Sequence, residues 1–279
     1  MAGLCFGHTP IRDLPMNAPL DSRLANWRLD GRTALVTGAS QGIGLACARE
    51  LAALGANVLM VARDETLLEQ SRAELAEECP AAEVLALAAD LGQNEERLAV
   101  FDWISDLELP LSLLVNNVGN NIIKPALDYT SEDLRGLLAT NLESAWDMCR
   151  LAHPHLVQHA HAAIVNVGSV SGITHVRTGA PYGMTKAALH QLTRNLACEW
   201  ADDGIRVNAV APWYIRTRRS QPALADADYL DEVLERTPMQ RIGEPEEVAA
   251  AVAFFCLPAA SYITGEVMAV DGGFLRYGF

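Results

Sequence analysis

The chain has 279 residues, half of them hydrophobic, which is enough to bury a sizeable core in one soluble domain. Its formal net charge is −14, which argues against a nucleic-acid partner because such a partner requires a basic surface. The six cysteines are scattered and form no C-x-x-C pair. The sequence also shows no secretory signal pattern and no apolar run long enough to cross a bilayer. These features together predict a cytoplasmic protein with no membrane partner.

Residues 1–27 carry several prolines and glycines and show neither helical nor strand periodicity, so we predict a flexible N-terminal extension before a single domain over 28–279. Met16 is an alternative start site, and the sequence leaves that question open. Further along, apolar runs alternate with amphipathic helical segments. This alternation is typical of an α/β fold, a doubly wound parallel sheet of the Rossmann type, which binds ligands at the carboxyl ends of its strands. Buried parallel strands are predicted near residues 33–37, 57–61, 84–88, 111–115, 163–167, 205–210 and 266–270.

A glycine-rich turn follows the first predicted strand, where residues 37–44 read TGASQGIG and a helix-like stretch comes next. A strand, a glycine turn and a helix in this order aim backbone N–H groups at a phosphate. In this variant of the dinucleotide fingerprint, Gly38 permits the tight turn, Gly42 the close approach of a pyrophosphate, and Gly44 the packing of helix against strand. The turn therefore predicts a nucleotide site, and an ordinary strand-to-helix turn is the alternative.

Tyr182 and Lys186 lie four residues apart on a predicted helix, which places a phenol and an ammonium group on one face. An unperturbed phenol titrates near pH ~10, so proton transfer near pH ~7 needs roughly 4 kcal/mol of help from the surroundings. A nearby cation favours the phenolate and gives help of the right sign. Because Y-x-x-x-K is an undemanding pattern, a chance pair on a solvated helix is the alternative that other motifs must exclude.

Several further motifs accompany the glycine turn and the Tyr182–Lys186 pair in a characteristic order. Together they resemble the short-chain dehydrogenase/reductase family from about Leu29 to the C-terminus. Three shorter segments and the C-terminal tail are similar to the tropinone reductase branch, although membership of a branch does not fix the substrate. The family motifs are Asn116–Gly119, Asn141, Ser169 and Val270–Gly273, and the branch motifs are Leu151–Pro154, Gln191–Arg194, Gly243–Pro245 and Pro258–Phe279.

The resemblance implies four catalytic residues, Asn141, Ser169, Tyr182 and Lys186. In the family, the tyrosine exchanges a proton with the substrate oxygen and the serine polarises that oxygen, while the lysine binds the nicotinamide ribose and lowers the pKa of the tyrosine. The asparagine helps to hold a water in a proton relay. Two alternatives stay open: simple turn chemistry for Ser169 or its neighbour Ser171, and bonding of the Asn141 side chain to nearby backbone.

The end of the second predicted strand bears on the choice between NAD and NADP. Relatives that use NAD commonly carry Asp at the position of Ala62, whereas Arg63 matches the basic residue of relatives that use NADP. NADP is therefore predicted, with NAD as the less favoured cofactor. Gln41 replaces a second basic residue of many NADP users and Asp64 lies close by, so a solvated Arg63 is the alternative.

The remaining cofactor contacts also come from the resemblance. Asp90 and Leu91 match an adenine-contacting pair, and capping of the next helix is the alternative for Asp90. Asn116 and Gly119 shape the loop behind the adenosine ribose or, alternatively, only link strands. The implied cofactor-binding residues are Gly38, Ser40, Gln41, Gly42, Ile43, Gly44, Arg63, Asp90, Leu91, Asn117, Gly119, Tyr182, Lys186, Pro212, Ile215 and Thr217.

Substrate contacts are predicted from Ser169, Ile173, His175 and Trp213, and the segment Arg216–Arg236 resembles the family's variable substrate flap. Trp213 replaces the glycine of the common Pro-Gly pair, and packing inside the protein is its alternative role. Several basic side chains around the flap could meet an acidic substrate, or could be ordinary solvated cations. These are Arg216, Arg218 and Arg219, with His175 and Arg177 opposite.

Four histidines, His153, His155, His159 and His161, lack a recognised metal-ligand spacing, so no metal is predicted. The expected activity is NADP(H)-dependent oxidoreduction of a small-molecule carbonyl or alcohol, in a homotetramer as is usual for the family. A catalytically silent nucleotide-binding regulator of the same fold is the alternative. A cofactor-using isomerase or dehydratase would normally require an added substrate domain.

Overall fold

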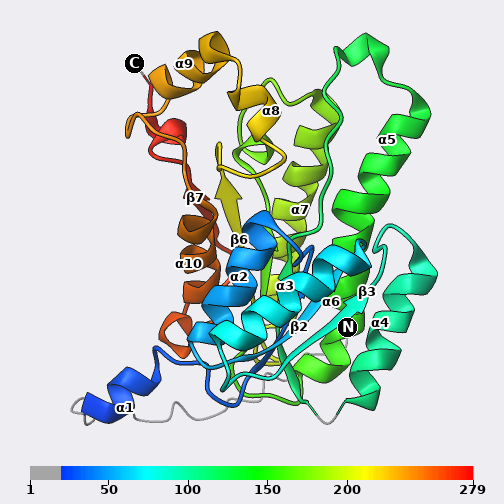
Figure 1. Ribbon diagram of the computed structural model, residues 1–279, viewed down its shortest axis with the longest axis vertical. Helices are drawn as coiled ribbons and strands as arrows, with labels where there is room; N and C mark the ends of the chain where they lie inside the picture. Colours follow the sequence, from blue (N-terminus) through cyan, green and yellow to red (C-terminus); the bar gives the residue numbers. More distant parts are fainter. Residues whose placement is uncertain (1–19, 108, 279) are drawn as a thin grey trace, which may run out of the picture.

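The computed structural model describes residues 20–107 and 109–278. Within them, seven strands form one parallel sheet in the order β3-β2-β1-β4-β5-β6-β7, which confirms the predicted fold (Figure 1). All seven predicted strands are present. They are β1 (Thr33–Thr37), β2 (Asn57–Ala62), β3 (Val84–Ala88), β4 (Leu111–Asn116), β5 (Ala162–Val167), β6 (Ile205–Pro212) and β7 (Val267–Val270).

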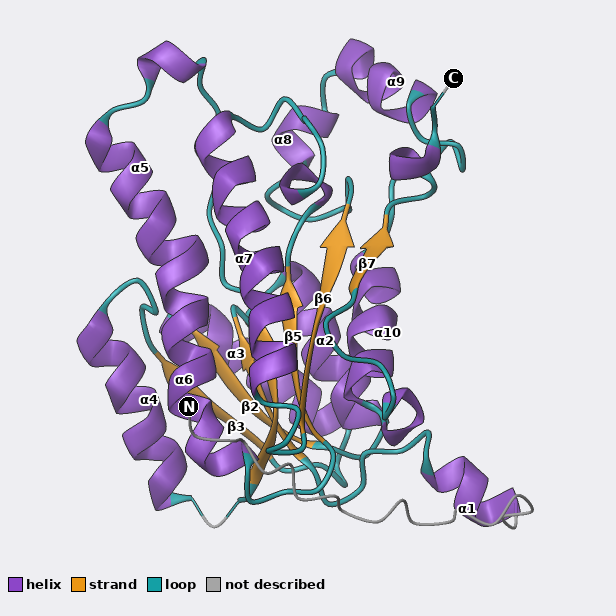
Figure 2. Cartoon of the chain, turned by 180° about the vertical axis from the view of Figure 1, so that it is seen from behind, coloured by secondary structure: helices purple, strands orange, loops and turns teal. Residues whose placement is uncertain are grey.

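Helices cover both faces of the sheet, as the views from the two sides show (Figures 1 and 2). In β1, Ala34 and Val36 pack into one apolar layer and Leu35 into the other, because successive side chains of a strand point to opposite faces. Burial on both faces explains why the central strands read as continuous apolar runs. One layer holds α2 (Gly42–Ala53), α3 (Glu65–Glu78) and α10 (Pro245–Cys256), and the other α4 (Asn94–Asp106), α6 (Ser144–Leu156) and α7 (Ala180–Glu199).

The N-terminal extension is described only in part, because residues 1–19 of the predicted segment lie outside the described residues. Where neither helix nor strand was predicted, the chain forms the short helix α1 (Leu20–Ala25). Trp27 then packs against Phe254 of α10, with ring centroids 6.3 Å apart. This aromatic contact attaches the segment after α1 to the domain. The boundary proposed at residue 28 stays a prediction.

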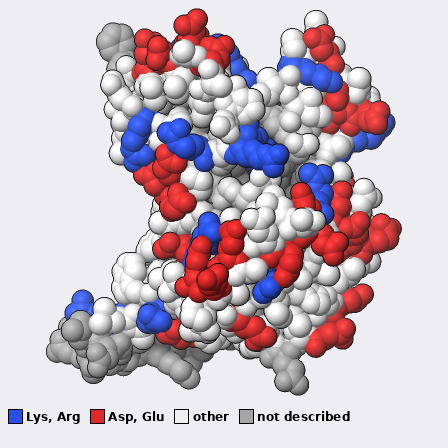
Figure 3. Space-filling model, in the orientation of Figure 1, with Lys and Arg blue, Asp and Glu red and all other residues white. Residues whose placement is uncertain are grey.

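Two helical segments rise beyond the carboxyl ends of the strands (Figure 1). The predicted flap forms α8 (Gln221–Leu224) and α9 (Ala227–Glu235). On the other side, α5 (Ser131–Leu138) continues into α6 through a π-helical turn, Ala139–Glu143. A hollow separates these two parts in the space-filling view (Figure 3), where acidic side chains are spread over the visible face without forming one patch.

The strand order locates the expected ligand site. The chain builds β1, β2 and β3 toward one edge of the sheet and then returns to place β4 on the other side of β1. In doubly wound sheets, ligands bind outside the carboxyl ends of the strands at such a reversal. The glycine turn after β1 and the loop after β4 therefore face the same crevice.

Candidate active site

The glycine turn has the backbone geometry that its sequence predicts. Gly38 has φ +64° and Gly42 has φ +58°, a region that favours glycine. A Cβ atom at Gly44 would lie 2.1 Å from the Gly38 carbonyl oxygen, so only glycine allows this approach of helix to turn. α2 begins at Gly42, and its N-cap residue Gln41 makes no side-chain bond to the first turn. The N–H groups of that turn are therefore available to an anion.

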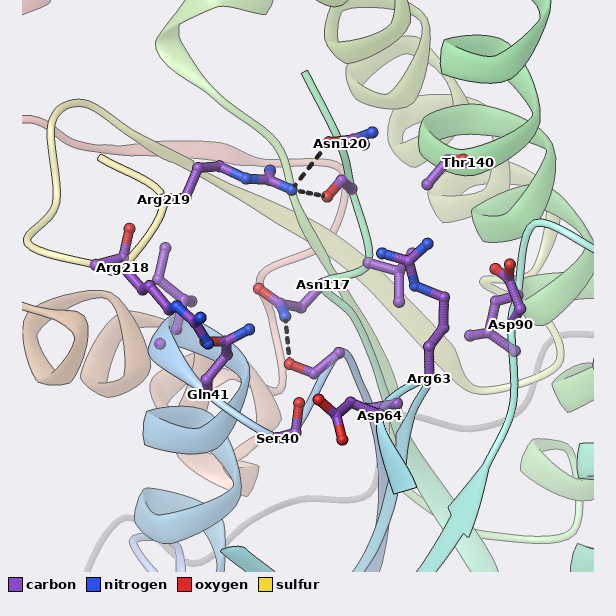
Figure 4. Close-up of a pocket in the computed structure, with 18 of the residues that line it drawn as sticks. Ser40, Gln41, Arg63, Asp64, Asp90, Asn117, Asn120, Thr140, Arg218 and Arg219 are labelled. Atoms are coloured by element: carbon purple, nitrogen blue, oxygen red, sulfur yellow. Dashed lines mark hydrogen bonds between the residues drawn. The ribbon is translucent and has the colours of Figure 1, made fainter. Parts of the chain in front are cut away.

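A cavity of about 880 Å³ lies over this turn at the carboxyl ends of β1 to β4 (Figure 4). The close backbone approach at the glycine turn, the helix N–H groups and the basic side chain of Arg63 in the lining fit a dinucleotide with a phosphorylated ribose. Gly44 packs behind the cavity and does not line it. The predicted cofactor residues that line it are Gly38, Ser40, Gln41, Gly42, Ile43, Arg63, Asp90, Leu91, Asn117, Gly119 and Thr217.

Arg63 and Asp64, the two residues that follow β2, have different roles. Asp64 is the N-cap of α3, and its Oδ1 accepts a hydrogen bond from the Leu67 N–H at 3.0 Å. The side chain of Arg63, by contrast, extends into the cavity, and Asp64 points toward Ser40 (Figure 4). The Asp64 carboxylate therefore caps α3, although Asp64 also lines the cavity, and Arg63 is the cation at this position.

The residues after β3 and β4 shape the far wall. Asp90 does not cap α4, whose N-cap is Gln93; its Oδ1 instead accepts from the Gly92 N–H at 3.0 Å. Asn117 donates to the Thr37 carbonyl at 3.0 Å and thereby joins the ends of β4 and β1. Asn116 is buried and donates to Asn166 Oδ1 at 2.9 Å, which supports the alternative that it only links strands.

A second cavity, of about 230 Å³, contains three of the predicted catalytic residues, Ser169, Tyr182 and Lys186. It adjoins the first cavity, because five residues line both. A molecule that extends along the crevice from the glycine turn would therefore reach the Tyr182 hydroxyl. The shared residues are Ile43, Asn117, Gly119, Thr217 and Arg219, and the predicted residues Pro212, Trp213 and Ile215 line the second cavity only.

Lys186 and Tyr182 lie on the face of α7 that borders this cavity. Lys186 Nζ lies 5.8 Å from the centroid of the Tyr182 ring and donates to the Val167 carbonyl at 2.9 Å. Ser169 follows β5, and its Oγ accepts from the Ser171 N–H at 3.1 Å. The Ser171 hydroxyl is paired with the hydroxyl of Thr178. The geometry therefore favours Ser169 over Ser171 as the hydroxyl that can meet a substrate oxygen.

Burial is the main cause of the pKa shifts of Tyr182 and Lys186. Desolvation, helped by the charge of Arg219, lowers the pKa of Lys186 to about 7. Burial raises the pKa of Tyr182, and the Ser169 hydroxyl and the charge of Arg219 partly oppose this. We predicted that Lys186 supplies the charge that lowers the tyrosine pKa, whereas here Arg219 supplies it. The physical reason is that burial disfavours the charged form of Lys186 itself.

Asn141 lies in the π-helical turn between α5 and α6 and is almost fully buried. Its Oδ1 accepts from the Asn120 N–H at 2.6 Å, and its Nδ2 donates to the Asn120 carbonyl at 2.8 Å and to Thr185 Oγ1 at 3.1 Å. The predicted alternative, bonding to backbone, is thus present. Asn141 fixes the loop that carries Gly119, whose Cβ would lie only 3.3 Å from Lys186 Nζ. Such π-helical turns occur frequently at functional sites.

The predicted substrate residues separate into two groups. Trp213 lines the Tyr182 cavity and also stacks on Phe274, with ring centroids 3.7 Å apart, so both of its proposed roles are present. Ile173 and His175 line neighbouring hollows and not this cavity. Their assignment as substrate contacts is not supported, because the loop after β5 turns them outward.

Val176 and Thr178, from the same loop as Ile173 and His175, line the cavity in their place. We did not single out either residue from the sequence. Their only signal was their place between Ser169 and Tyr182, since this segment must cross the mouth of the site.

Two of the four candidate anion-binding arginines are paired with carboxylates. Arg177 forms an ion pair with Glu232, and Arg216 with Glu244 at 2.9 Å. Arg218 lines the cofactor cavity, whereas Arg219 reaches across to the Gly119 carbonyl at 2.5 Å. The alternative of surface cations therefore applies to Arg177 and Arg216.

The histidine cluster shows ordinary surface contacts. His153 pairs with Asp203 at 2.9 Å, and desolvation lowers the pKa of both His155 and His159. Over the described residues, no group of three or more His, Cys, Asp or Glu side chains is arranged to hold a metal ion. Within the same residues, each helix is too short or too polar to cross a membrane.

Known proteins resemble the chain over almost its whole length. A profile of the family described as enoyl-(acyl carrier protein) reductase matches residues 38–275. A tropinone reductase homolog of Arabidopsis thaliana is 47% identical over 254 residues, which cover 91% of this chain and 93% of the relative. Senescence-associated protein 13 of the same plant is 47% identical over 256 residues, covering 91% and 94%.

A solved structure shares the fold as well. The gluconate 5-dehydrogenase of Burkholderia cenocepacia J2315, in complex with NADP and tartrate, superposes with a TM-score of 0.86 at 31% identity and covers 91% of this chain and 99% of its own. The fold, the motifs in their order and these relatives agree. The chain belongs to the short-chain dehydrogenase/reductase family.

Proposed function

We propose that the protein transfers a hydride between NADP(H) and a carbonyl group or secondary alcohol of a small molecule. The observation that carries the proposal is the junction of the two cavities, which places Tyr182, Lys186 and Ser169 at the end of the crevice that begins at the glycine turn. A bound nicotinamide would supply or accept the hydride at this junction. The resemblance to tropinone reductase homologs agrees with carbonyl chemistry.

The chain's own residues would handle the proton and the oxygen. In the reductive direction, the Tyr182 hydroxyl donates a proton to the carbonyl oxygen, and the Ser169 hydroxyl donates a hydrogen bond to that oxygen. The positive charge of Arg219 stabilises the phenolate that remains. Oxidation follows the same steps in reverse. Asn141 acts at a distance, because it holds the backbone of Asn120, the neighbour in the chain of Gly119, which lies beside Lys186.

NADP is the proposed cofactor. Arg63 lies where a ribose 2′-phosphate would extend, and its planar guanidinium suits a phosphate. Asp64, which could have favoured the free hydroxyl of NAD, is committed to capping α3. The Burkholderia relative carries NADP in its complex, which agrees with this choice.

The decisive test combines a ketone panel with one substitution. Oxidation of NADPH should depend on a carbonyl substrate, and Tyr182→Phe should lower kcat at least about a hundredfold while the affinity for NADPH changes little. Tyr262→Phe is a matched control, since Tyr262 is fully exposed and lies outside both cavities. Full activity in Tyr182→Phe would remove this residue from the mechanism. Tight NADPH binding without turnover of any ketone would favour the silent regulator.

A homotetramer and a cytoplasmic location are further proposals, and both come from the family resemblance and the sequence pattern. Light scattering on the purified protein would test the first, because a tetramer has four times the chain mass of 30.1 kDa. Imaging of a tagged full-length chain would test the second.

A further inference from the structure

The cavity around Tyr182 has an unusual charge for this protein. Two basic side chains and no carboxylate are found among the described residues that line it. The whole chain carries a net charge of −14. Lys186, one of the two basic residues, is 3% exposed and its Nζ is bonded to the Val167 carbonyl. The accessible cation of the cavity is therefore Arg219.

Arg219 reaches across the crevice without a carboxylate partner. Its Nη2 donates to the Gly119 carbonyl at 2.5 Å and lies 3.4 Å from Asn120 Oδ1 (Figure 4), and both acceptors are neutral. None of the ion pairs between described residues includes it. Because a guanidinium carries five N–H donors, the other edge of the group can still bind an oxygen ligand.

The charge of Arg219 acts on the reacting groups themselves. It lowers the pKa of Tyr182 and also that of Lys186. Arg219, Tyr182 and Lys186 line the same cavity, so the guanidinium faces the space in which a substrate oxygen would meet the tyrosine. The volume of about 230 Å³ suits a small molecule, which could contact Tyr182 and Arg219 at the same time because both residues line this cavity.

We propose that Arg219 binds a carboxylate of the substrate, so that the preferred substrates are small oxo acids and the corresponding hydroxy acids. This inference rests on the proposed function. In the reductive direction, a hydride from NADPH joins the carbonyl carbon, a proton from Tyr182 joins the carbonyl oxygen, and the carboxylate is unchanged. Two N–H groups of a guanidinium can donate to the two oxygens of one carboxylate, and such charge-assisted hydrogen bonds are stronger than hydrogen bonds between neutral groups.

The cofactor is the competing anion, because Arg219 lines the larger cavity as well. The two roles differ in what they predict. An arginine that binds the substrate carboxylate discriminates between an acid and its neutral amide of similar size. An arginine that binds the cofactor phosphates affects both substrates equally and weakens NADPH binding.

The experiment compares kcat/KM for three oxo acids, pyruvate, acetoacetate and levulinate, with those for their primary amides. We expect at least one acid to be preferred over its amide by about tenfold or more. Arg219→Leu should abolish that preference while KM for NADPH changes less than about twofold. Arg216→Leu is the matched control and should keep the preference, since Arg216 is exposed, paired with Glu244 and outside both cavities.

Two results would overturn the proposal: turnover of neutral ketones with no preference for acids, or an equal loss on acid and amide with a raised KM for NADPH in Arg219→Leu. If no carbonyl compound is turned over, the proposed function fails instead. Binding of the same acids, followed through tryptophan fluorescence, then decides the carboxylate site separately. If the wild-type protein binds the acids and Arg219→Leu binds them about tenfold more weakly, the carboxylate site at Arg219 is supported. If both proteins bind the acids equally well, the site is refuted.

Discussion

The buried amine of Lys186 leads to a quantitative prediction about stability. Its pKa is lowered from 10.5 to about 7, chiefly by desolvation. A difference of about 3.5 pH units at ~1.4 kcal/mol each means that the charged amine destabilises the fold by roughly 5 kcal/mol. Lys186→Met removes the charge and keeps a long side chain, but it also leaves the buried Val167 carbonyl without its hydrogen-bond donor, which costs about 1–3 kcal/mol. The cofactor-free variant should therefore be more stable by roughly 2–4 kcal/mol near pH ~7.

The sign of the pH dependence follows from proton binding. In the unfolded chain, the amine keeps its proton up to its ordinary pKa of 10.5, whereas the folded protein releases it above about pH 7. Between these values the unfolded state binds more protons, so this lysine makes the wild-type protein more stable as the pH rises. The advantage of Lys186→Met is therefore largest at and below pH ~7 and decreases toward pH ~10.5.

Urea unfolding followed by circular dichroism, from about pH 6 to about pH 10, measures this difference. Both proteins are compared without cofactor and at one concentration, because ligands and oligomerisation shift apparent stability. Lys124→Met is the control, since Lys124 is partly exposed and paired with Asp133, and its effect should stay below about 1 kcal/mol. Turnover should be lost in Lys186→Met only. A variant that is less stable than wild type at neutral pH, or an advantage independent of pH, would refute the reasoning.

Two further substitutions test the cofactor site. Arg63→Leu should raise KM for NADPH about tenfold or more and leave KM for NADH nearly unchanged. The control Arg135→Leu, at an exposed position of α5, should alter neither value. Equal effects on both cofactors would contradict the assignment of Arg63 to the 2′-phosphate. Gly44→Ala would place its Cβ 2.1 Å from the Gly38 carbonyl, so we expect a loss of about 1–3 kcal/mol and weaker NADPH binding. Gly136→Ala, where a Cβ meets nothing within 4 Å, should be neutral or stabilising by up to about 1 kcal/mol in the same denaturation assay.

The strands were predictable because burial on both faces of a parallel sheet leaves a direct mark on the sequence. In β4, all six residues Leu111–Asn116 are buried, and Ser112 and Asn116 are the two polar ones. The glycine turn was predictable for a similar reason. Gly38 and Gly44 occupy positions where a side chain is excluded by backbone conformation or by contact, and only glycine satisfies both constraints.

The orientations of loop side chains were not predictable, because contacts between distant segments decide them. Arg177 and Arg216 looked equivalent to Arg219 in the sequence. Their difference depends on Glu232 and Glu244, which come 55 and 28 residues later in the chain and neutralise the first two arginines. The outward turn of His175 likewise depends on how the loop after β5 meets the flap. Periodicity carries no information about either contact.

Helix α7 shows how the demands of the site compete with those of folding. Next to the cavity its buried face is polar, with Thr185, Lys186 and His190 at 1–3% exposure, although an amphipathic helix normally buries apolar residues there. Leu189 is buried within the same stretch, and farther along the helix Thr193 is buried and accepts a hydrogen bond from Asn166, whereas Leu196 and Ala197 join an apolar cluster. The two buried titratable groups, Lys186 and His190, thus lie in the part of the helix nearer to Tyr182. Burial of polar groups is unfavourable, so a helix selected for stability alone would carry the apolar pattern throughout. The burial of Lys186 and His190 therefore indicates that this part of α7 is selected for chemistry, and Lys186→Met measures how much stability that chemistry costs.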